Sequence, residues 1–262
     1  MILRRVIQHV RKQEWKAIWI DLAIVVVGVF IGIQVSNWNE QRADARLGSD
    51  YVNRLSRDLG EDQAGIRGQA DYYAAVLESV RKTDALLRTS APDPRALVVN
   101  AYRATEVIYI PPVRATWDQI VSSGHLALLP EGAVESGLSQ YYSIDAARDT
   151  YTEGLDSAYR KTVRTLIPLT MQSAMRAGCS DVRDKWGNVV GFADECTLDV
   201  DPAELGKVAE TLRSDPAVLA DLQYQYSDVV SAVLNLRGVS GVIKDAQAAL
   251  VAEPKAAGGR TP

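Results

Sequence analysis

Histidine and cysteine are scarce in this chain, which has two of each among 262 residues. Catalytic triads that use histidine, and metal sites rich in histidine, need more such side chains than His9 and His125 can supply. The sequence also lacks a phosphate-binding loop and a dinucleotide-binding fingerprint. We therefore predict no catalytic residues, no metal site and no cofactor, and we expect that the protein is not an enzyme.

Long apolar runs are equally rare, and one stretch stands out. Residues 18–35 read IWIDLAIVVVGVFIGIQV, and only Asp21 and Gln34 interrupt their apolar character. Three tryptophans suited to membrane interfaces lie near its two ends, namely Trp15, Trp19 and Trp38. A helix of this length crosses the hydrocarbon core of a bilayer. The sequence therefore predicts a transmembrane helix over residues 18–38 that contacts the lipid bilayer.

The residues before this helix are basic. Arg4, Arg5, Arg11, Lys12 and Lys16 stand there against one acid, Glu14. Because the basic end of a single span stays on the cytoplasmic side, we predict a cytoplasmic tail over residues 1–17. In a bacterium, this predicts a single-pass protein of the inner membrane with a periplasmic helical domain over residues 39–251. Residues 252–262 are rich in Gly, Pro and Ala and predict a disordered tail.

A cleaved signal peptide is the alternative to this signal anchor. Its cleavage site would be a small-x-small triplet directly after the apolar run. Residues 35–37, Val-Ser-Asn, fit that pattern poorly, and the Ala-Asp-Ala triplet at residues 43–45 lies far downstream. The sequence therefore favours an anchor that is retained.

Acidic residues dominate the outer domain. The whole chain has 29 basic and 33 acidic residues, and five of the basic but only two of the acidic ones lie before residue 39. An acidic surface repels phosphates, so we expect no binding to nucleic acid.

Both cysteines, Cys179 and Cys196, fall in the predicted periplasmic domain, where disulfides form and persist. The segment between them contains Gly187 and Gly191 and predicts a small hairpin or Ω-loop. Metal binding and a reactive thiol are the alternatives, but a metal would need further ligands nearby. We predict one structural disulfide that closes this loop.

Apolar residues recur at spacings of three, four and seven beyond the span, which predicts helices. We expect the span to continue as one helix to about Arg88, with three glycines as weak points. A helix over about residues 94–105 and an extended connector over residues 108–112 should follow. Asp-Pro pairs at residues 201–202 and 215–216 mark the starts of the last two helices.

The middle of the chain predicts further helices. Thr116 is expected to cap a short helix that Gly124 ends. A helical region should then run from Pro130 to about Arg176, with a kink at Pro168. The predicted fold class is all-α, with an N-terminal transmembrane helix leading into a periplasmic antiparallel helical bundle that carries a small disulfide-closed loop.

Two groups of side chains in the outer domain raise the question of a site. Residues 58–62, Asp-Leu-Gly-Glu-Asp, form an acidic run, which usually marks a solvated helix face. Tyrosine pairs at residues 72–73, 141–142 and 224/226 could line a ligand groove, but such side chains more often pack at the edge of a core. We favour the structural interpretation for both groups.

Within the span, Gly28 and Gly32 lie one helical turn apart. This small-xxx-small spacing lets two helix backbones approach closely. Asp21 shares their face on a helical wheel. Acids inside a membrane are often functional, although Asp21 lies in the first turn of the span, where it can snorkel to the headgroups or to Lys16. We predict self-association, or contact with another membrane protein, through this helix-packing interface.

The end of the span carries a motif. Residues 28–40 read GVFIGIQVSNWNE, which resembles the signature of an uncharacterised family of bacterial single-pass membrane proteins, a domain of unknown function whose anchor ends in Gln-x-Asn/Ser-Asn-Trp-Asn-Glu. Asp21 stands where that family usually has Glu. Residues 115–126, ATWDQIVSSGHL, are similar to a second segment of the family, and the tyrosines at residues 141–142 follow at a similar distance. The resemblance implies a membrane anchor and a helical fold, and it implies no assigned activity.

Both segments also have a physical interpretation. Four residues of the first form a membrane-interface motif, namely Asn37, Trp38, Asn39 and Glu40. Its tryptophan suits the outer interface, and its polar neighbours can satisfy groups where the helix leaves lipid or contact a partner. In the second segment, Trp117 and Ile120 should face the core.

Three functions compete. The leading hypothesis is a non-catalytic, membrane-anchored periplasmic interaction or scaffold module, a subunit of a larger complex. The second is a periplasmic ligand-binding sensor domain, which would need a partner to relay its signal into the cell. The third is a proton-coupled accessory subunit that uses Asp21. A closed core without a pocket favours the first, a cavity lined by the tyrosines favours the second, and co-purification with a multi-span channel protein favours the third.

Overall fold

The computed structural model describes residues 15–179, 181–183, 185 and 187–251. The chain is mostly helical and divides into two compact units, with the boundary between Val52 and Asn53. Most of the predicted cytoplasmic tail, residues 1–17, and all of the predicted disordered tail, residues 252–262, lie outside the described residues.

Helix α2, Trp15–Leu87, is a single helix of 73 residues. It confirms the prediction that the helix of the apolar span continues to about Arg88. The glycines at positions 60, 65 and 68 do not interrupt it. A glycine weakens a helix by only about 1 kcal/mol relative to alanine, and the apolar side chains that this part of α2 buries offset that loss.

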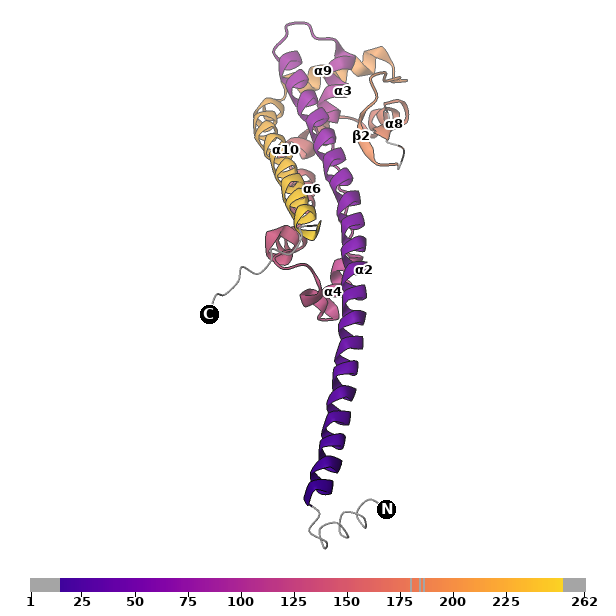
Figure 1. The fold of residues 1–262 in the computed structure, drawn as a ribbon. Coiled ribbons are helices and arrows are strands. Elements are labelled where there is room, and N and C mark those ends of the chain that lie inside the picture. The colour runs from indigo at the N-terminus through magenta and orange to yellow at the C-terminus, as the bar shows by residue number, and fades with distance from the viewer. Residues whose placement is uncertain (1–14, 180, 184, 186, 252–262) are drawn as a thin grey trace. The chain divides into compact units, whose positions relative to one another are not determined.

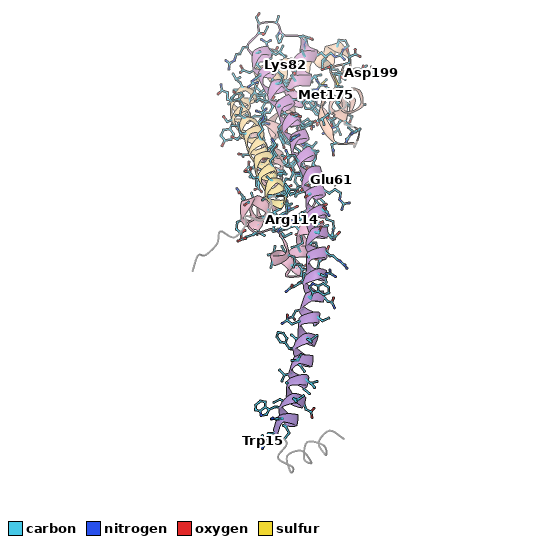
Figure 2. All side chains as sticks on the ribbon, in the orientation of Figure 1. Trp15, Glu61, Lys82, Arg114, Met175 and Asp199 are labelled. Carbon is cyan, nitrogen blue, oxygen red and sulfur yellow. A yellow bond between two sulfur atoms is a disulfide. The ribbon has the colours of Figure 1, made fainter. Side chains whose placement is uncertain are left out.

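Between Trp19 and Trp38, the large apolar side chains of α2, drawn as sticks in Figure 2, are each at least half exposed. Val29 is 59% exposed and Phe30 is 60% exposed. Among the described residues, this helix is the one long and apolar enough to cross a membrane, judged by length and composition. Contact of so much apolar surface with water is unfavourable, whereas lipid accepts it.

The second unit contains the rest of α2 followed by shorter elements. These are α3 (Pro94–Arg103), α4 (Ala115–Ser122), the 3₁₀ turn η1 (His125–Leu128), the π-helical turn η2 (Val134–Leu138), α5 (Ser139–Ser143), α6 (Ala146–Asp156), α7 (Ala158–Leu166), α8 (Leu169–Gly178), α9 (Pro202–Ser214) and α10 (Pro216–Val251). The helix starts predicted near residues 94, 202 and 216 are confirmed. Residues 106–114 have no regular structure, which confirms the predicted connector.

Aspartates begin three of these helices. Asp93, Asp201 and Asp215 each accept a hydrogen bond from the backbone N–H two residues later, at 2.9–3.0 Å. A proline follows each aspartate in the first turn, where the missing N–H removes no hydrogen bond. This local chemistry explains why the sequence alone located these three helix starts.

The predicted capping role of Thr116 is wrong. Thr116 lies inside α4 and is buried, while Arg114 occupies the N-cap position without a side-chain capping bond. The other end of α4 follows the prediction, because Gly124 adopts the left-handed conformation with φ 71° that glycine tolerates best.

The helical region predicted from residue 130 to residue 176 is broken into several pieces. Gly137, with φ 127°, interrupts it first. Asp145 and Ser157 then cap α6 and α7 with their side chains, and Pro168 precedes α8. Apolar spacing continues across these breaks because successive short helices face the same core, so periodicity by itself did not reveal them.

The core of the second unit joins six helices. Its members include Val80 of α2, Leu97 of α3, Val163 of α7, Met171 of α8, Leu212 of α9 and Leu222 of α10. Helix α3 packs on α9, and α7 packs on α10. Gln63 of α2 is hydrogen-bonded to Ser240 of α10. Further along α2, Arg81 lies 6.0 Å from the ring of Tyr226, so α10 runs back along this part of α2 (Figure 1).

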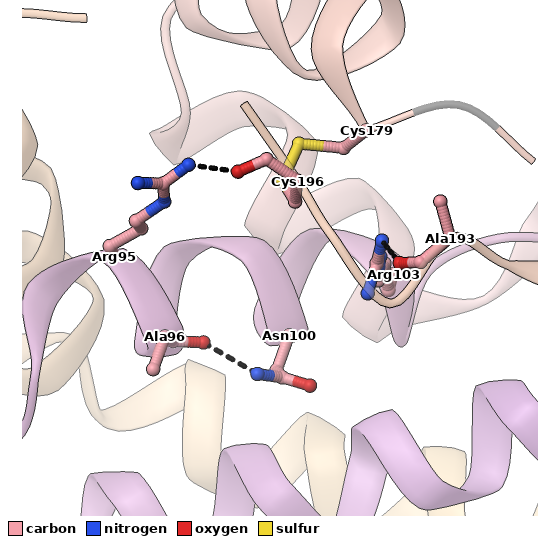
Figure 3. Close-up of a disulfide and its surroundings, with 7 residues drawn as sticks. All are labelled: Arg95, Ala96, Asn100, Arg103, Cys179, Ala193 and Cys196. Atoms are coloured by element: carbon pink, nitrogen blue, oxygen red, sulfur yellow. Dashed lines mark hydrogen bonds between the residues drawn. A yellow bond between two sulfur atoms is a disulfide. The ribbon is translucent and has the colours of Figure 1, made fainter. Parts of the chain in front are cut away.

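A small antiparallel hairpin lies between the cysteines. Strand β1, Asp181–Arg183, pairs with β2, Val189–Phe192. Cys179 and Cys196 form a disulfide, which confirms the prediction (Figure 3). The bond closes a sequence separation of 17 residues, and on the chain-entropy model such a bond stabilises the fold by about 3 kcal/mol.

Helix α3 holds the far end of this loop. Arg95 donates a hydrogen bond to the carbonyl oxygen of Cys196, and Arg103 donates one to that of Ala193 at 2.7 Å (Figure 3). The Arg103 guanidinium also lies 5.0 Å from the ring centre of Phe192. The disulfide loop is therefore fastened to the core helices by arginines that sequence periodicity does not single out.

Candidate functional site

The second unit contains an open groove of about 780 Å³. Three segments supply most of its lining, which are residues 56–69 of α2, the connector at residues 110–113, and residues 141–147 at the end of α5 and the start of α6. Asn188 and Val239 of α10 complete it. Its volume falls in the range of pockets that hold small organic ligands. We call this cavity the groove from here on.

The connector is attached to α2 by side chains of the helix. Asp62 accepts a hydrogen bond from the Val113 N–H at 2.8 Å, and Gln69 donates one to the Ile110 carbonyl at 3.3 Å. The two prolines between these contacts, at positions 111 and 112, lack N–H groups and hold the chain extended. An extended segment therefore lies along α2 and forms one rim of the groove.

Asp62 is the most unusual group of this wall. It is 5% exposed, and its Oδ2 atom has no hydrogen-bond partner among the described residues. Burial raises the pKa of this carboxyl to about 6, and the charges of Asp58 and Glu61 raise it further, while the Val113 N–H and the Tyr141 hydroxyl lower it. A carboxyl that is ionised at neutral pH is thus held beside the groove, with the Tyr141 hydroxyl near it and its Oδ2 atom without a hydrogen bond from the described residues.

Gln69 presents a second unused acceptor. Its side chain is fully buried, and its Oε1 atom has no hydrogen-bond partner among the described residues. An unsatisfied buried acceptor typically costs about 1–3 kcal/mol, so two of them in one wall call for an explanation. A bound molecule that donates hydrogen bonds supplies one.

Residues 141–147 contribute a tyrosine, a carboxylate and apolar groups to the lining. Tyr141 lines the groove and its hydroxyl faces Asp62, whose charge, together with burial, raises the pKa of Tyr141. Asp145 accepts a hydrogen bond from the Tyr109 hydroxyl at 2.6 Å, and burial with this contact raises the pKa of Tyr109 to about 12. Ile144 lines the groove while 55% exposed, which leaves an apolar side chain available to a ligand.

The other tyrosines of the predicted pairs do not line the groove. Tyr142 is buried and stacks on Trp117 at 5.0 Å, and Ile120 is fully buried, as predicted for that segment. The pair at residues 72–73 is buried in the core. Tyr224 is 72% exposed on α10, so the interpretation of core-edge packing is wrong for that residue.

The prediction that residues 58–62 form a solvated face is wrong for Asp62. The sequence did contain a signal for its burial. Counted along α2, positions 55, 59, 62, 66, 69 and 73 alternate spacings of four and three, and all six are buried. Asp62 and Gln69 thus interrupt an apolar stripe, and a polar residue at a stripe position indicates either a buried hydrogen bond or a ligand contact.

A second polar cluster lies under the hairpin and is structural. The Glu106 carboxylate, whose side chain is 10% exposed, binds Arg164 at 3.0 Å and Arg176 at 3.4 Å. Arg164 also donates to the Thr105 hydroxyl and lies 3.6 Å from the ring centre of Tyr102. Two small cavities of about 250 and 240 Å³ border this cluster. Because Glu106 is already paired with both arginines, this cluster is a weaker candidate for a ligand site than the groove.

The residues predicted to form a helix-packing interface lie on the exposed surface of α2. A Cβ atom added to Gly28 or Gly32 would meet nothing within 4 Å, and Asp21 is exposed. The membrane-interface motif lies within α2 as well, and the Arg42 guanidinium covers the Trp38 ring at 3.9 Å. The interface and the motif stay predictions, since they concern lipid or a second chain.

The described residues contain no group of three or more His, Cys, Asp or Glu side chains that could hold a metal ion. No family model, curated protein or solved structure matches the chain. The resemblance to the single-pass membrane family therefore stays a prediction, and the groove is the feature on which an argument about function can be built.

Proposed function

We propose that this chain is a membrane-anchored binding module whose outer domain takes a small ligand into the groove. Of the functions considered from the sequence, this is the ligand-binding alternative. One observation carries it, namely a cavity of about 780 Å³ with the unpartnered carboxylate oxygen of buried Asp62 in its wall. Buried polar groups that converge on an apolar cavity are typical of ligand sites.

The role of the anchor in this proposal is to hold the binding domain at the membrane, and it takes no part in binding the ligand. In this proposal, residues 18–38 span the inner membrane, residues 1–17 lie in the cytoplasm, and residues 39–251 form a helical bundle in the periplasm. A bound state would reach the cell interior through a second membrane protein that packs on Gly28 and Gly32. The proposal thus retains a partner in the membrane, as the scaffold hypothesis did.

We propose binding without catalysis. The polar side chains that line the groove are three carboxylates, two amides, one hydroxyl, one guanidinium and one tyrosine. No histidine or cysteine is among them, so the lining offers no pairing of a nucleophile with an imidazole base. The proton-coupled alternative depends on Asp21 alone, and the outer domain adds no observation in its favour.

The experiment compares the chain with a variant whose groove is filled. Gly60 lines the groove on α2, and a Cβ added there meets nothing within 4 Å. Gly60→Phe should therefore fill the groove without a clash, and loss of a helix-internal glycine should leave the fold at least as stable. Gly206→Phe in α9 is the matched control, because its position is equally open and lies outside the groove.

The full chain and both variants, in lipid nanodiscs, are screened by ligand-observed NMR against a diverse library of small organic fragments. We expect a set of fragments that bind the unaltered chain and Gly206→Phe, compete with one another, and lose binding to Gly60→Phe. If every fragment that binds the chain binds Gly60→Phe equally well, or none binds at all, the groove is not a ligand site and the proposal is wrong.

A further inference from the structure

The acidic groups around the groove outnumber the basic ones. Glu61, Asp62 and Asp145 line it, against one cation, Arg57. Asp145 is engaged by the Tyr109 hydroxyl and by the Arg148 N–H, whereas Asp62 keeps one oxygen without a partner. The Tyr141 hydroxyl, which faces Asp62, is neutral and does not balance the carboxylate charge. Asp62 can therefore accept a further hydrogen bond from a positively charged donor.

Apolar side chains also line the groove. Ile66 on α2, Pro112 on the connector, and Ile144 and Ala147 beyond α5 all line the groove. A bulky apolar group can occupy the cavity while a single cationic end reaches Asp62. The Coulomb attraction between the carboxylate and an organic cation is stronger beside such groups than in water, because the local dielectric constant is lower.

Building on the proposed function, we propose that the groove binds a small organic cation, an amine or guanidine carried on an apolar body, which pairs with the Asp62 carboxylate. The amide oxygen of Gln69, about two helical turns further along the same stripe, accepts a hydrogen bond from a further N–H of the ligand. The apolar body lies against Pro112 and Ile144.

Binding should depend on pH. The ionisable groups that act on Asp62 are Asp58 and Glu61 on its own helix and Tyr141 on α5. With its pKa raised to about 6, the Asp62 carboxyl is largely ionised at pH 8 and largely protonated at pH 5. A cation that needs the ionised form should bind about tenfold more weakly at pH 5 than at pH 8.

The probes are phenylbutylamine and phenylbutanol, which share an apolar body and differ in their charged end. Their dissociation constants are measured by titration of the full chain in nanodiscs. We expect the amine to bind at least about tenfold more tightly than the alcohol at pH 8, and we expect only the binding of the amine to weaken at pH 5.

In Asp62→Asn, which keeps an acceptor for the Val113 N–H, the two probes should bind alike. Asp71→Asn, an exposed position of the same helix, is the matched control.

The outcomes separate this inference from the function on which it depends. Amine and alcohol that bind equally to the unaltered chain, with both lost in Gly60→Phe, would overturn the cation and leave the groove as a ligand site. An amine preference that persists in Asp62→Asn would also overturn it. Failure of both probes to bind, or equal binding to Gly60→Phe, would contradict the groove and the cation together. The pH series on the unaltered chain needs no variant, so a folding defect in Asp62→Asn cannot hide the answer.

Discussion

At the scale of single residues, Asp62 illustrates how burial changes a common side chain. The same carboxylate on the outer face of α2 would be solvated, and there it would resemble the many exposed acids of this domain. In the apolar stripe it loses water, and in exchange it gains the backbone N–H of Val113 and the neighbouring hydroxyl of Tyr141. The groove is a candidate site because the Oδ2 atom of this buried carboxylate has no hydrogen bond from the described residues.

Asp62 should make the stability of the domain depend on pH. Its folded-state pKa of about 6 lies above the ordinary value, so between pH 4 and pH 6 the folded chain holds a proton that the unfolded chain releases. Stability should therefore fall as pH rises through this window and level off above it. The full effect would be at most ~3 kcal/mol, and solvent in the open groove reduces it to roughly 1–2 kcal/mol.

Urea unfolding of the full chain in detergent micelles, followed by circular dichroism from pH 4 to pH 8, measures this effect. Asp62→Asn should lose this decline and should be more stable than the unaltered chain at pH 7.5, by roughly 1–2 kcal/mol. Asp71→Asn should keep the decline. An identical pH profile in Asp62→Asn would mean that the carboxyl is not perturbed by its surroundings.

Glu106 should be important for stability rather than for binding. Its carboxylate lies between Arg164 and Arg176, and the Arg164 side chain is only 17% exposed. Glu106→Gln would leave that buried guanidinium without a counter-charge, so we expect a loss of about 2–4 kcal/mol in the free energy of unfolding.

The control is Glu78→Gln on α2. Glu78 pairs with Lys82 at 3.8 Å, and both side chains are more than half exposed. Water screens such a pair, so the change should stay within about 0.5 kcal/mol in the same urea experiment. Equal effects of the two substitutions would contradict the distinction between buried and exposed ion pairs in this domain.

At the scale of elements, α2 combines two compositions in one continuous helix. Residues 18–35 are apolar with two exceptions, Asp21 and Gln34, residues 39–50 are mostly polar, and from residue 51 onward the helix buries one stripe and exposes polar residues elsewhere. This change in composition is the one expected where a helix leaves lipid, because a helix in lipid is apolar all round whereas a helix on a water-exposed domain is apolar along one face.

The exposed glycines of the span should mediate association with another membrane helix. Gly28→Leu combined with Gly32→Leu would fill the open surface at both positions and keep two backbones apart. Crosslinking in membranes, with the chain itself or with a partner, should fall, although insertion should persist because apolarity rises. Val27→Leu combined with Ile31→Leu has the same spacing on another face and should leave crosslinking unchanged. Unaltered crosslinking in the double glycine variant would reduce the span to a passive tether.

At the scale of the whole molecule, the sequence predicts which side of the membrane each part occupies. A reporter enzyme active only in the periplasm should work when it is fused after Val251. A reporter that fluoresces only in the cytoplasm should work when it is fused ahead of the basic tail, because positive residues are retained on the cytoplasmic side. Fluorescence of the second reporter at the position after Val251 would reverse the topology and with it the periplasmic assignment of the groove.

The sequence by itself determined the features that are set by neighbouring residues. The apolar run from residue 18, the uninterrupted helix that follows it, the helix starts at Asp93, Asp201 and Asp215, and the glycine end of α4 all depend on interactions within a few positions. The disulfide between Cys179 and Cys196 followed from composition, because the chain has no other cysteine with which either could pair. The helix boundaries in this set can be predicted because the interactions that create them join residues close together in the sequence.

The tertiary structure decided what depends on distant contacts. The breaks between residues 130 and 176 arise where short helices turn to follow one core, and the Glu106 cluster joins residues 58 positions apart in sequence. The groove needs α2, the connector and the start of α6 together, and no one of these segments predicts it. Asp62 appeared in the sequence as one acid in a charged run. Packing removes water from one side of α2 and leaves a cavity on the same side. Asp62 therefore becomes a buried carboxylate with one oxygen that can accept a hydrogen bond from a ligand.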